Sequence, residues 1–323
     1  FVYQALVLFI NNNAAELRIS NMKKEIDTTE SNHKYNLAIF FAILAAVLYA
    51  ISMPLSKILL KNVPPMMMAA FLYIGAGIGM LLLGMIRSKT KVANKEEKLE
   101  RKDLPYTVSM VVLDIAAPIF LMLGLKTTAA ANASLLNNFE IVATAIIALI
   151  LFHEQITRSL WIAIILVTIA CILLTVDDAS SLSFSAGSLF VLSACICWGL
   201  ENNCTRCISH KDPLEIVTIK GFGSGLGSLC IALSVGEPFP LWQYLPMVML
   251  LGFVAYGMSI FFYTYAQRTI GATKTSTFYA VAPFIGMLLS FVILGEEITF
   301  VFIIGLAFMI AGAYFATFDN AKS

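Results

Sequence analysis

The sequence contains two similar stretches, Phe152-His153-Glu154-Gln155-Ile156-Thr157 and Leu294-Gly295-Glu296-Glu297-Ile298-Thr299. They lie 142 residues apart, and each one follows a long apolar run. Earlier in the chain the match continues at a shift of 149 residues, where Pro64 aligns with Pro213. The change of shift is explained by a longer charged loop in the first half. We therefore predict that the chain contains two copies of one structural unit.

The composition places both copies in a membrane. Of the 323 residues, 59% are hydrophobic and only 13% are charged, whereas a soluble domain has about 25% charged residues. The net charge is only +1, so no global field attracts polyanions. These values exclude a soluble enzyme, a disordered chain and a nucleic-acid binder. They indicate an all-α, multi-pass membrane protein.

Ten apolar runs are long enough to be membrane spans, each of which needs roughly 20 residues. The predicted spans are residues 37–60, 65–86, 105–125, 128–152, 159–176, 187–208, 214–235, 243–266, 271–294 and 299–318. The segment 87–104 between two of them is dense in Lys, Arg and Glu. It is predicted to be a solvated loop, and a partner-binding site is the alternative.

Each copy holds five spans, so the second copy enters the membrane from the opposite face. Lys57 of the first copy aligns with Arg206 of the second. Inverted repeats of this kind are typical of secondary transporters that work by alternating access. The alternative is a chance alignment of apolar helices, which the ordered matches of Pro, basic and Glu positions disfavour.

This duplication predicts the domain organisation. The predicted parts are an N-terminal tail 1–36, a first repeat 37–176, a linker 177–186, a second repeat 187–318 and a C-terminal tail 319–323. Met22 precedes a polar stretch and resembles a natural start, so residues 1–21 are expected to be translated sequence upstream of the true start or the tail of a fragment.

The basic residues predict an orientation, because Lys and Arg accumulate in cytoplasmic loops. With the N-terminus in the cytoplasm, only Lys57, Lys61 and Lys126 of the 21 Lys and Arg residues fall on the outer side, and Lys220 falls within a span. Both termini are therefore predicted to be cytoplasmic. Short tails and loops without an organelle signal favour a bacterial cytoplasmic membrane.

The repeated Glu-x-Ile-Thr step, the Trp198-Gly199 step and the ten spans resemble the drug/metabolite transporter superfamily, specifically its EamA-type members. The resemblance covers residues 37–318. One position departs from it, because Glu140 stands where the second copy has the family-like Ala282-Pro283 step. The resemblance implies export of a small polar metabolite such as an amino acid. It also implies that six helices line a central cavity.

Polar and aromatic residues form stripes within the spans. Trp198, Glu201, Asn202 and Thr205 share one helical face, since their spacing is i, i+3, i+4 and i+7. An ionisable residue in a span costs about 2.5–3.5 kcal/mol on insertion scales, so it tends to face the bundle interior. The candidate substrate-binding residues are Tyr49, Asp114, Asn137, Asn138, Glu140, Trp198, Glu201, Asn202, Lys220, Tyr256, Tyr263 and Tyr279.

Glu140 and Glu201 are also the candidate proton-coupling residues, since burial favours the protonated form of a carboxyl. The alternative role for the polar stripes is hydrogen bonding between helices. For Lys220 the alternatives are a carboxylate partner in the cavity or an amine that reaches back to the interface.

Several motifs are set aside. The glycines near residues 75–79 and 221–227 follow no strand, so they predict close helix packing and no nucleotide site. Cys204, Cys207 and His210 offer three metal ligands where zinc usually has four. We therefore expect no metal, no cofactor and no ATP-driven step.

The functional prediction is a secondary transporter whose partners are a small molecule and the lipid bilayer, with no nucleic acid. Substrate identity and oligomeric state stay open. Efflux of drugs or amphipathic cations is the main alternative, ahead of a passive channel or an intramembrane enzyme.

Overall fold

The computed structural model describes residues 34–88, 97–153, 155–178, 183–208, 210–270, 275 and 278–320. The predicted start at Met22 and most of both tails lie outside these residues. A first helix covers residues 34–50. The helices that follow are α2 (Ser52–Leu59), α3 (Pro65–Ser88), α4 (Leu104–Thr127), α5 (Ala130–Leu136), α6 (Phe139–Phe152), α7 (Arg158–Thr175), α8 (Ala186–Ile208), α9 (Pro213–Val235), α10 (Leu245–Gly252), α11 (Ser259–Ile270), α13 (Ala282–Leu294) and α14 (Phe300–Asn320).

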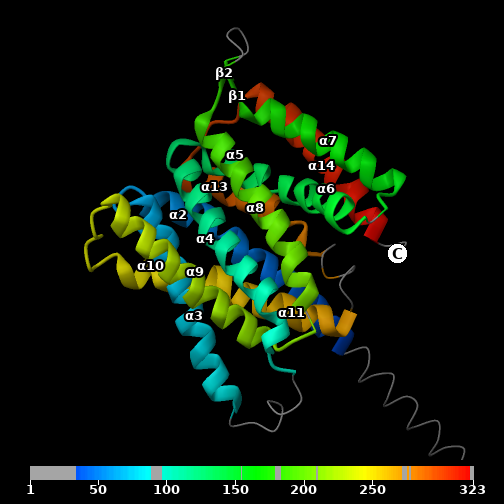
Figure 1. Ribbon diagram of the computed structural model, residues 1–323. Coiled ribbons are helices and arrows are strands. Elements are labelled where there is room, and N and C mark those ends of the chain that lie inside the picture. The colour runs from blue at the N-terminus through cyan, green and yellow to red at the C-terminus, as the bar shows by residue number, and fades with distance from the viewer. Residues whose placement is uncertain are drawn as a thin grey trace, which may run out of the picture.

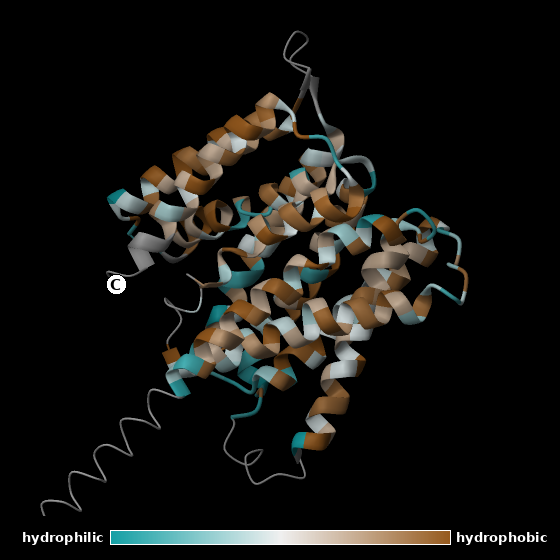
Figure 2. Cartoon of the chain, turned by 180° about the vertical axis from the view of Figure 1, so that it is seen from behind, coloured by the Kyte–Doolittle hydropathy of each residue, from teal (hydrophilic) through white to brown (hydrophobic). Residues whose placement is uncertain are grey.

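The described residues confirm an all-α membrane fold. Seven helical stretches are long and apolar enough to cross a bilayer, and the apolar helices Ala282–Leu294 and Phe300–Ala316 are shorter. The 23-residue helix α8 carries Glu201, Asn202 and Asn203, which lower its hydropathy. These segments overlap the ten predicted spans, although part of the ninth, 271–294, lies outside the described residues. Figure 2 shows apolar residues over most of the helical surface.

Helices that lie far apart in the sequence pack side by side. Figure 1 shows α7 beside α14 on one side of the molecule, and α3 beside α9 on the other. Close approach of α3 and α9 depends on glycine, because a Cβ at Gly221 would lie 2.5 Å from the Cα of Gly77. The predicted packing role of these glycines agrees with this contact.

The described residues of the duplicated stretch fold alike in both copies. His153 directly follows α6 and Gly295 directly follows α13, and both residues adopt a left-handed conformation, with φ of 54° and 65°. The next helices begin alike, since the hydroxyls of Thr157 and Thr299 accept from the amides of Leu160 and Phe302. The repeated sequence is therefore a helix stop followed by a helix start.

Several predicted spans are interrupted near their middle. The first span is irregular at Ile51, where the helical hydrogen bonds continue on both sides. The fourth tightens at Asn137–Asn138 between α5 and α6, where the amides of Glu140 and Ile141 donate three residues back rather than four. The ninth has a turn at Ala280–Val281, and the eighth contains a π-helical segment, Phe253–Met258. Backbone irregularities within a membrane are tolerated where protein or a cavity surrounds them, and they often mark transporter sites.

Part of the predicted linker 177–186 folds as a short antiparallel hairpin. Strand β1 (Val176–Asp178) pairs with β2 (Ser183–Phe184), with Val176 opposite Phe184. The two paired strands lie at one end of the molecule in Figure 1.

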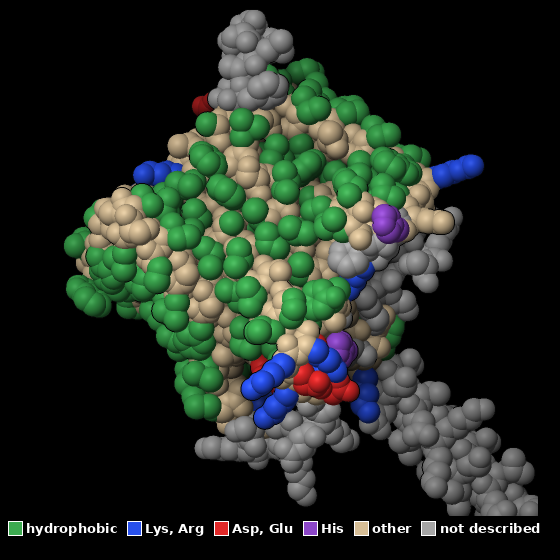
Figure 3. Space-filling view, in the orientation of Figure 1, with side chains coloured by type: hydrophobic (Ala, Val, Ile, Leu, Met, Phe, Trp, Pro, Cys, Tyr) green, Lys and Arg blue, Asp and Glu red, His purple; other side chains and the backbone are tan. Residues whose placement is uncertain are grey.

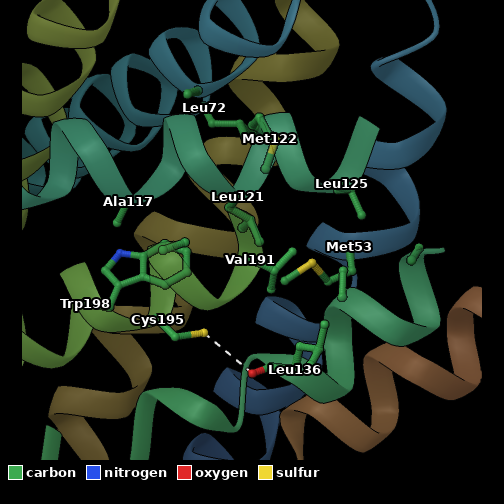
Figure 4. Close-up of a cluster of buried hydrophobic side chains, with 14 of the residues drawn as sticks. Met53, Leu72, Ala117, Leu121, Met122, Leu125, Leu136, Val191, Cys195 and Trp198 are labelled. Atoms are coloured by element: carbon green, nitrogen blue, oxygen red, sulfur yellow. Dashed lines mark hydrogen bonds between the residues drawn. The ribbon is translucent and has the colours of Figure 1, made fainter. Parts of the chain in front are cut away.

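The apolar core lies between the helices that carry the polar stripes. Figure 4 shows Trp198 of α8 beside Ala117 of α4, and the thiol of Cys195 directed at the carbonyl of Leu136 of α5. Charged side chains gather at the opposite end of the molecule from the hairpin, as the lower edge of Figure 3 shows.

Candidate functional site

An ion cluster joins three helices inside the bundle. The amine of Lys220 on α9 lies 3.0 Å from the carboxylate of Asp114 on α4 and 3.0 Å from that of Glu201 on α8. The side chains of Asp114 and Glu201 are 0% and 2% exposed, and that of Lys220 is 14% exposed. Buried charges are tolerated when they are paired and hydrogen-bonded, and both carboxylates meet this condition through one lysine.

Further donors hold the two carboxylates in place. Asp114 accepts from the indole of Trp198 at 3.1 Å and from the hydroxyl of Tyr73 at 3.3 Å. Glu201 accepts from the hydroxyl of Thr205, one turn further along α8. These neutral donors partly replace the water that a carboxylate loses on burial.

A second polar group lies between α6 and α8. The amide of Asn202 donates to Glu140 at 2.7 Å and lies 3.5 Å from the hydroxyl of Thr144. Both Glu140 and Asn202 are partly exposed, unlike Asp114. Among the described residues, Glu140 has no Lys or Arg at ion-pair distance. Its carboxylate is therefore the member of the site that lacks a cation.

Tyrosine rings form a third part of the site. The ring of Tyr49 contacts those of Tyr256 and Tyr279 at centroid distances of 5.9 Å each. Tyr263 contacts Tyr279 at 5.1 Å, and Asn137 donates to the Tyr49 hydroxyl at 3.1 Å. These residues lie next to the helix interruptions, so the irregular backbone and the aromatic cluster coincide.

The structure joins most of the predicted residues into these three groups. The single face predicted on α8 is divided, because Trp198 and Glu201 meet α4 and α9 while Asn202 meets α6. Asn138 stands apart, since its amide donates to the carbonyl of Leu135 within its own segment. Lys220 is a carboxylate partner, which was one of its two predicted roles.

Tyr73 belongs to the site but was not among the residues predicted from the sequence. It lies on α3, whose neighbours Phe71, Leu72 and Ile74 are all apolar, so no polar stripe marks it. Its ring contacts Tyr256 at a centroid distance of 5.5 Å, and its hydroxyl reaches Asp114. Tyr73 thus connects the aromatic cluster to the ion cluster. Its 6% exposure is the structural sign that it belongs to the interior.

In the described part of the chain, no group of three or more His, Cys, Asp or Glu side chains is arranged to hold a metal ion. What the arrangement offers chemically is a set of acidic side chains, one amine, amides and aromatic rings.

Apolar helices in inverted repeats around a buried polar site define a multi-pass membrane transporter. The chain belongs to the EamA-like transporter family, whose profile matches residues 36–176 and again 185–318. Membership of this family argues against an enzyme.

Two relatives agree with this class. An uncharacterized transporter of Methanothermobacter thermautotrophicus is 26% identical over 271 residues, which cover 79% of this chain and 78% of the relative. The uncharacterized transporter YyaM of Bacillus subtilis is 24% identical over 233 residues, which cover 69% and 76%. A crystal structure with 18% sequence identity shares the fold, with a TM-score of 0.64 over 88% of this chain and 97% of that chain.

Proposed function

We propose that this chain is a secondary transporter that exports a small metabolite carrying an amino group, such as an amino acid, by alternating access. Segments of the two repeats 37–176 and 187–318 would rearrange so that the site opens to one face at a time, in a bacterial cytoplasmic membrane with both termini in the cytoplasm. The observation that carries the proposal is the ion cluster of Asp114, Glu201 and Lys220 beside Glu140.

The charge of the site supports an amino-bearing substrate. The site holds three carboxylates and one lysine, which pairs with two of them, so it has an excess of negative charge when all three are ionised. Glu140, which is partly exposed and paired only with Asn202 among the described residues, is the natural partner for a substrate ammonium group. The contacting rings of Tyr49 and Tyr279 add aromatic faces to the site, and aromatic faces also attract cations.

The same excess charge supports coupling to protons. A carboxylate that binds either a proton or a substrate ammonium group, but not both, couples the transport of protons to the transport of substrate. Glu140 and Glu201 are the candidates for this exchange. Coupling through Glu140 leaves the Lys220 pairs intact, whereas coupling through Glu201 breaks one of them.

Purified protein in liposomes tests the proposal. Amino acids and amines are screened for uptake that depends on an imposed pH gradient. The variant Glu140→Gln should lose pH-dependent transport at least about tenfold, a change of ~1.4 kcal/mol in coupling, while keeping the fold because Gln can still accept from Asn202. Glu297→Gln, at an exposed position, is the matched control. Unchanged transport and unchanged pH dependence in both Glu140→Gln and Glu201→Gln would exclude proton coupling through these residues.

Efflux of an amphipathic cation is the second candidate, and the tyrosine cluster favours it. The two candidate substrates differ because an amino acid carries a carboxylate and an amphipathic cation does not. An amino acid and the corresponding amine without the carboxyl group should therefore be compared as competitors of transport. Stronger competition by the decarboxylated amine would favour cation efflux. Transport that persists unchanged after the gradient collapses would indicate a channel, and chemically altered substrate would indicate an enzyme.

A further inference from the structure

Lys57 connects α2 to the end of α4 and to the short segment between α4 and α5. It lies in the last turn of α2. Its amine donates to the carbonyl oxygens of Leu125 at 2.6 Å, Lys126 at 3.2 Å and Thr128 at 2.7 Å. The last carbonyls of a helix lack partners within the helix and carry partial negative charge. The lysine therefore satisfies the end of α4 while tying α2 to it.

Glu296 makes the complementary contact at the start of the next helix. Its two carboxylate oxygens accept from the amides of Ala130 at 2.6 Å and Ala131 at 2.8 Å, in the first turn of α5. Glu296 follows the end of α13, and the hydroxyl of Ser134 also donates to the carbonyl of Pro283 at 2.8 Å. Helix α5 is thus fixed to both ends of α13.

We propose that Lys57 and Glu296 form a latch that closes the transporter at the membrane face where α2 ends, the outer face in the predicted orientation. The latch joins α2, α4 and α5 of the first repeat to α13 of the second. It must release when the substrate site opens to that face. This inference rests on alternating access in the proposed function.

The helix interruptions make such a movement feasible. The joined segments α2, α5 and α13 each adjoin a turn within their span, at Ile51, at Asn137–Asn138 and at Ala280–Val281. Each segment can therefore change its angle at an existing irregularity in the helix. Lys57 also aligns with Arg206 of the inverted repeat, which lies near the end of α8 at the opposite face.

Glu237 provides a matched comparison. Its carboxylate accepts from the amides of Met66 at 3.2 Å and Met67 at 2.9 Å, in the first turn of α3. The chemistry is the same as that of Glu296, but Glu237 connects α9 to α3. Those helices are in backbone contact at Gly77 and Gly221, so they form a rigid pair. Glu237 should act as a helix cap alone.

The test uses the full chain in nanodiscs with the substitution Ser56→Cys. Ser56 is 1% exposed on α2, and its hydroxyl has no hydrogen-bond partner among the described residues, so the substitution removes no described bond. A charged, water-soluble thiol reagent is applied, and labelling of the introduced thiol at position 56 is followed by peptide mass. Hydrogen exchange of residues 130–136 and of residues 65–70 is measured in the same samples.

With Glu296→Gln, labelling at position 56 should become about tenfold faster, which corresponds to ~1.4 kcal/mol, the scale of a lost hydrogen bond to a charged group. Exchange should rise throughout α5. Lys57→Gln should raise hydrogen exchange in α5 in the same way. It replaces Glu296→Gln as the test variant if Glu296→Gln does not fold. Glu237→Gln should raise exchange only at the start of α3 and leave the labelling rate unchanged.

The latch is overturned if Glu296→Gln leaves labelling at position 56 at the rate seen with Glu237→Gln, and if its exchange rises only at Ala130 and Ala131. These readouts need no substrate. A faster labelling rate without transport of any amino-bearing compound would support the latch and overturn the proposed substrate class.

Discussion

The amine of Lys220 lies 3.0 Å from the carboxylate of Asp114, although the two residues come from helices in different repeats. Asp114 is fully buried, and Glu201 approaches the same amine from α8. Lys220 is thus the single described cation that pairs with both carboxylates. Its loss should affect the protein more than the loss of either acid.

Replacing Lys220 with Met should destabilise the protein by about 3–5 kcal/mol, because two buried carboxylates lose their partner. The double variant Lys220→Met with Asp114→Asn should lose less than the sum of the two single changes. Thermal unfolding of the purified variants measures both effects. The exposed Lys126 supplies the control Lys126→Met, which should stay within about 0.5 kcal/mol of the parent. Equal stability of the two Met variants would contradict a central role for Lys220.

Replacing Tyr73 with Phe should remove one donor from Asp114 and keep the ring packed against Tyr256. A hydrogen bond to a charged group contributes about 1.5–3 kcal/mol, and at 3.3 Å the lower part of this range is expected. Thermal unfolding and transport should both report the loss. Tyr106→Phe, at an exposed position of α4, should change neither. Identical thermal unfolding and transport of the two variants would show that the hydroxyl of Tyr73 does not contribute to the site.

Replacing Gly221 with Ala should separate α3 from α9, because the new Cβ would lie 2.5 Å from the backbone of Gly77. Overpacking of this kind typically costs about 1–3 kcal/mol. Gly84 on α3 has no atom within 4 Å of an added Cβ, so Gly84→Ala should stabilise the helix by up to about 1 kcal/mol. Opposite shifts of the unfolding temperature would confirm this difference, and equal shifts would contradict it.

The loop between α3 and α4 should make stability sensitive to acid. Lys211 is 1% exposed and lies within 3.6 Å of carboxylate oxygens of Glu97, Glu100 and Asp103. Hydrogen bonds from the amines of Lys102 and Lys211, together with their charges, lower the pKa of Glu100. A lowered carboxyl pKa adds stability above the unfolded pKa, and this stability is lost as the pH falls through the folded pKa.

One variant can show whether Glu100 causes the pH dependence of stability. The unfolding temperature of the parent should fall between neutral pH and a pH below the ordinary carboxyl pKa of about 4. Glu100→Gln should be slightly less stable at neutral pH and should lose less on acidification. A parallel decrease in both proteins would show that other groups cause the acid sensitivity.

Periodicity predicted the helices and the faces of the polar residues, because burial in a membrane imposes a strong pattern on each span. It did not predict how those faces meet. Trp198 and Asn202 share a stripe on α8 but contact different neighbours, and only helix packing decides this. The role suggested for the charged segment 87–104 as a solvated loop was incomplete, since residues 97–103 enclose the buried Lys211.

The periodicity of apolar and polar residues also did not predict the irregular turns within the helices. Asn137 and Asn138 were recognised as polar residues in a continuous span, whereas the structure ends α5 before them and begins α6 after them. Asn favours turns over helix interiors but also occurs within helices, so the position of the turn depends on tertiary contacts such as the bond from Asn137 to Tyr49. Tyr73 was missed for a related reason, because one tyrosine in an apolar helix has no distinctive spacing.

The tight turn at Asn137–Asn138 redirects the backbone hydrogen bonds just before Glu140. The amides of Glu140 and Ile141 donate to the carbonyls of Asn137 and Asn138, three residues back rather than four. The carbonyl of Leu136, which would serve Glu140 in a regular α-helix, accepts instead from the thiol of Cys195 on α8 at 3.6 Å. A side chain of the second repeat therefore completes the backbone of the first repeat next to the acid that distinguishes the two.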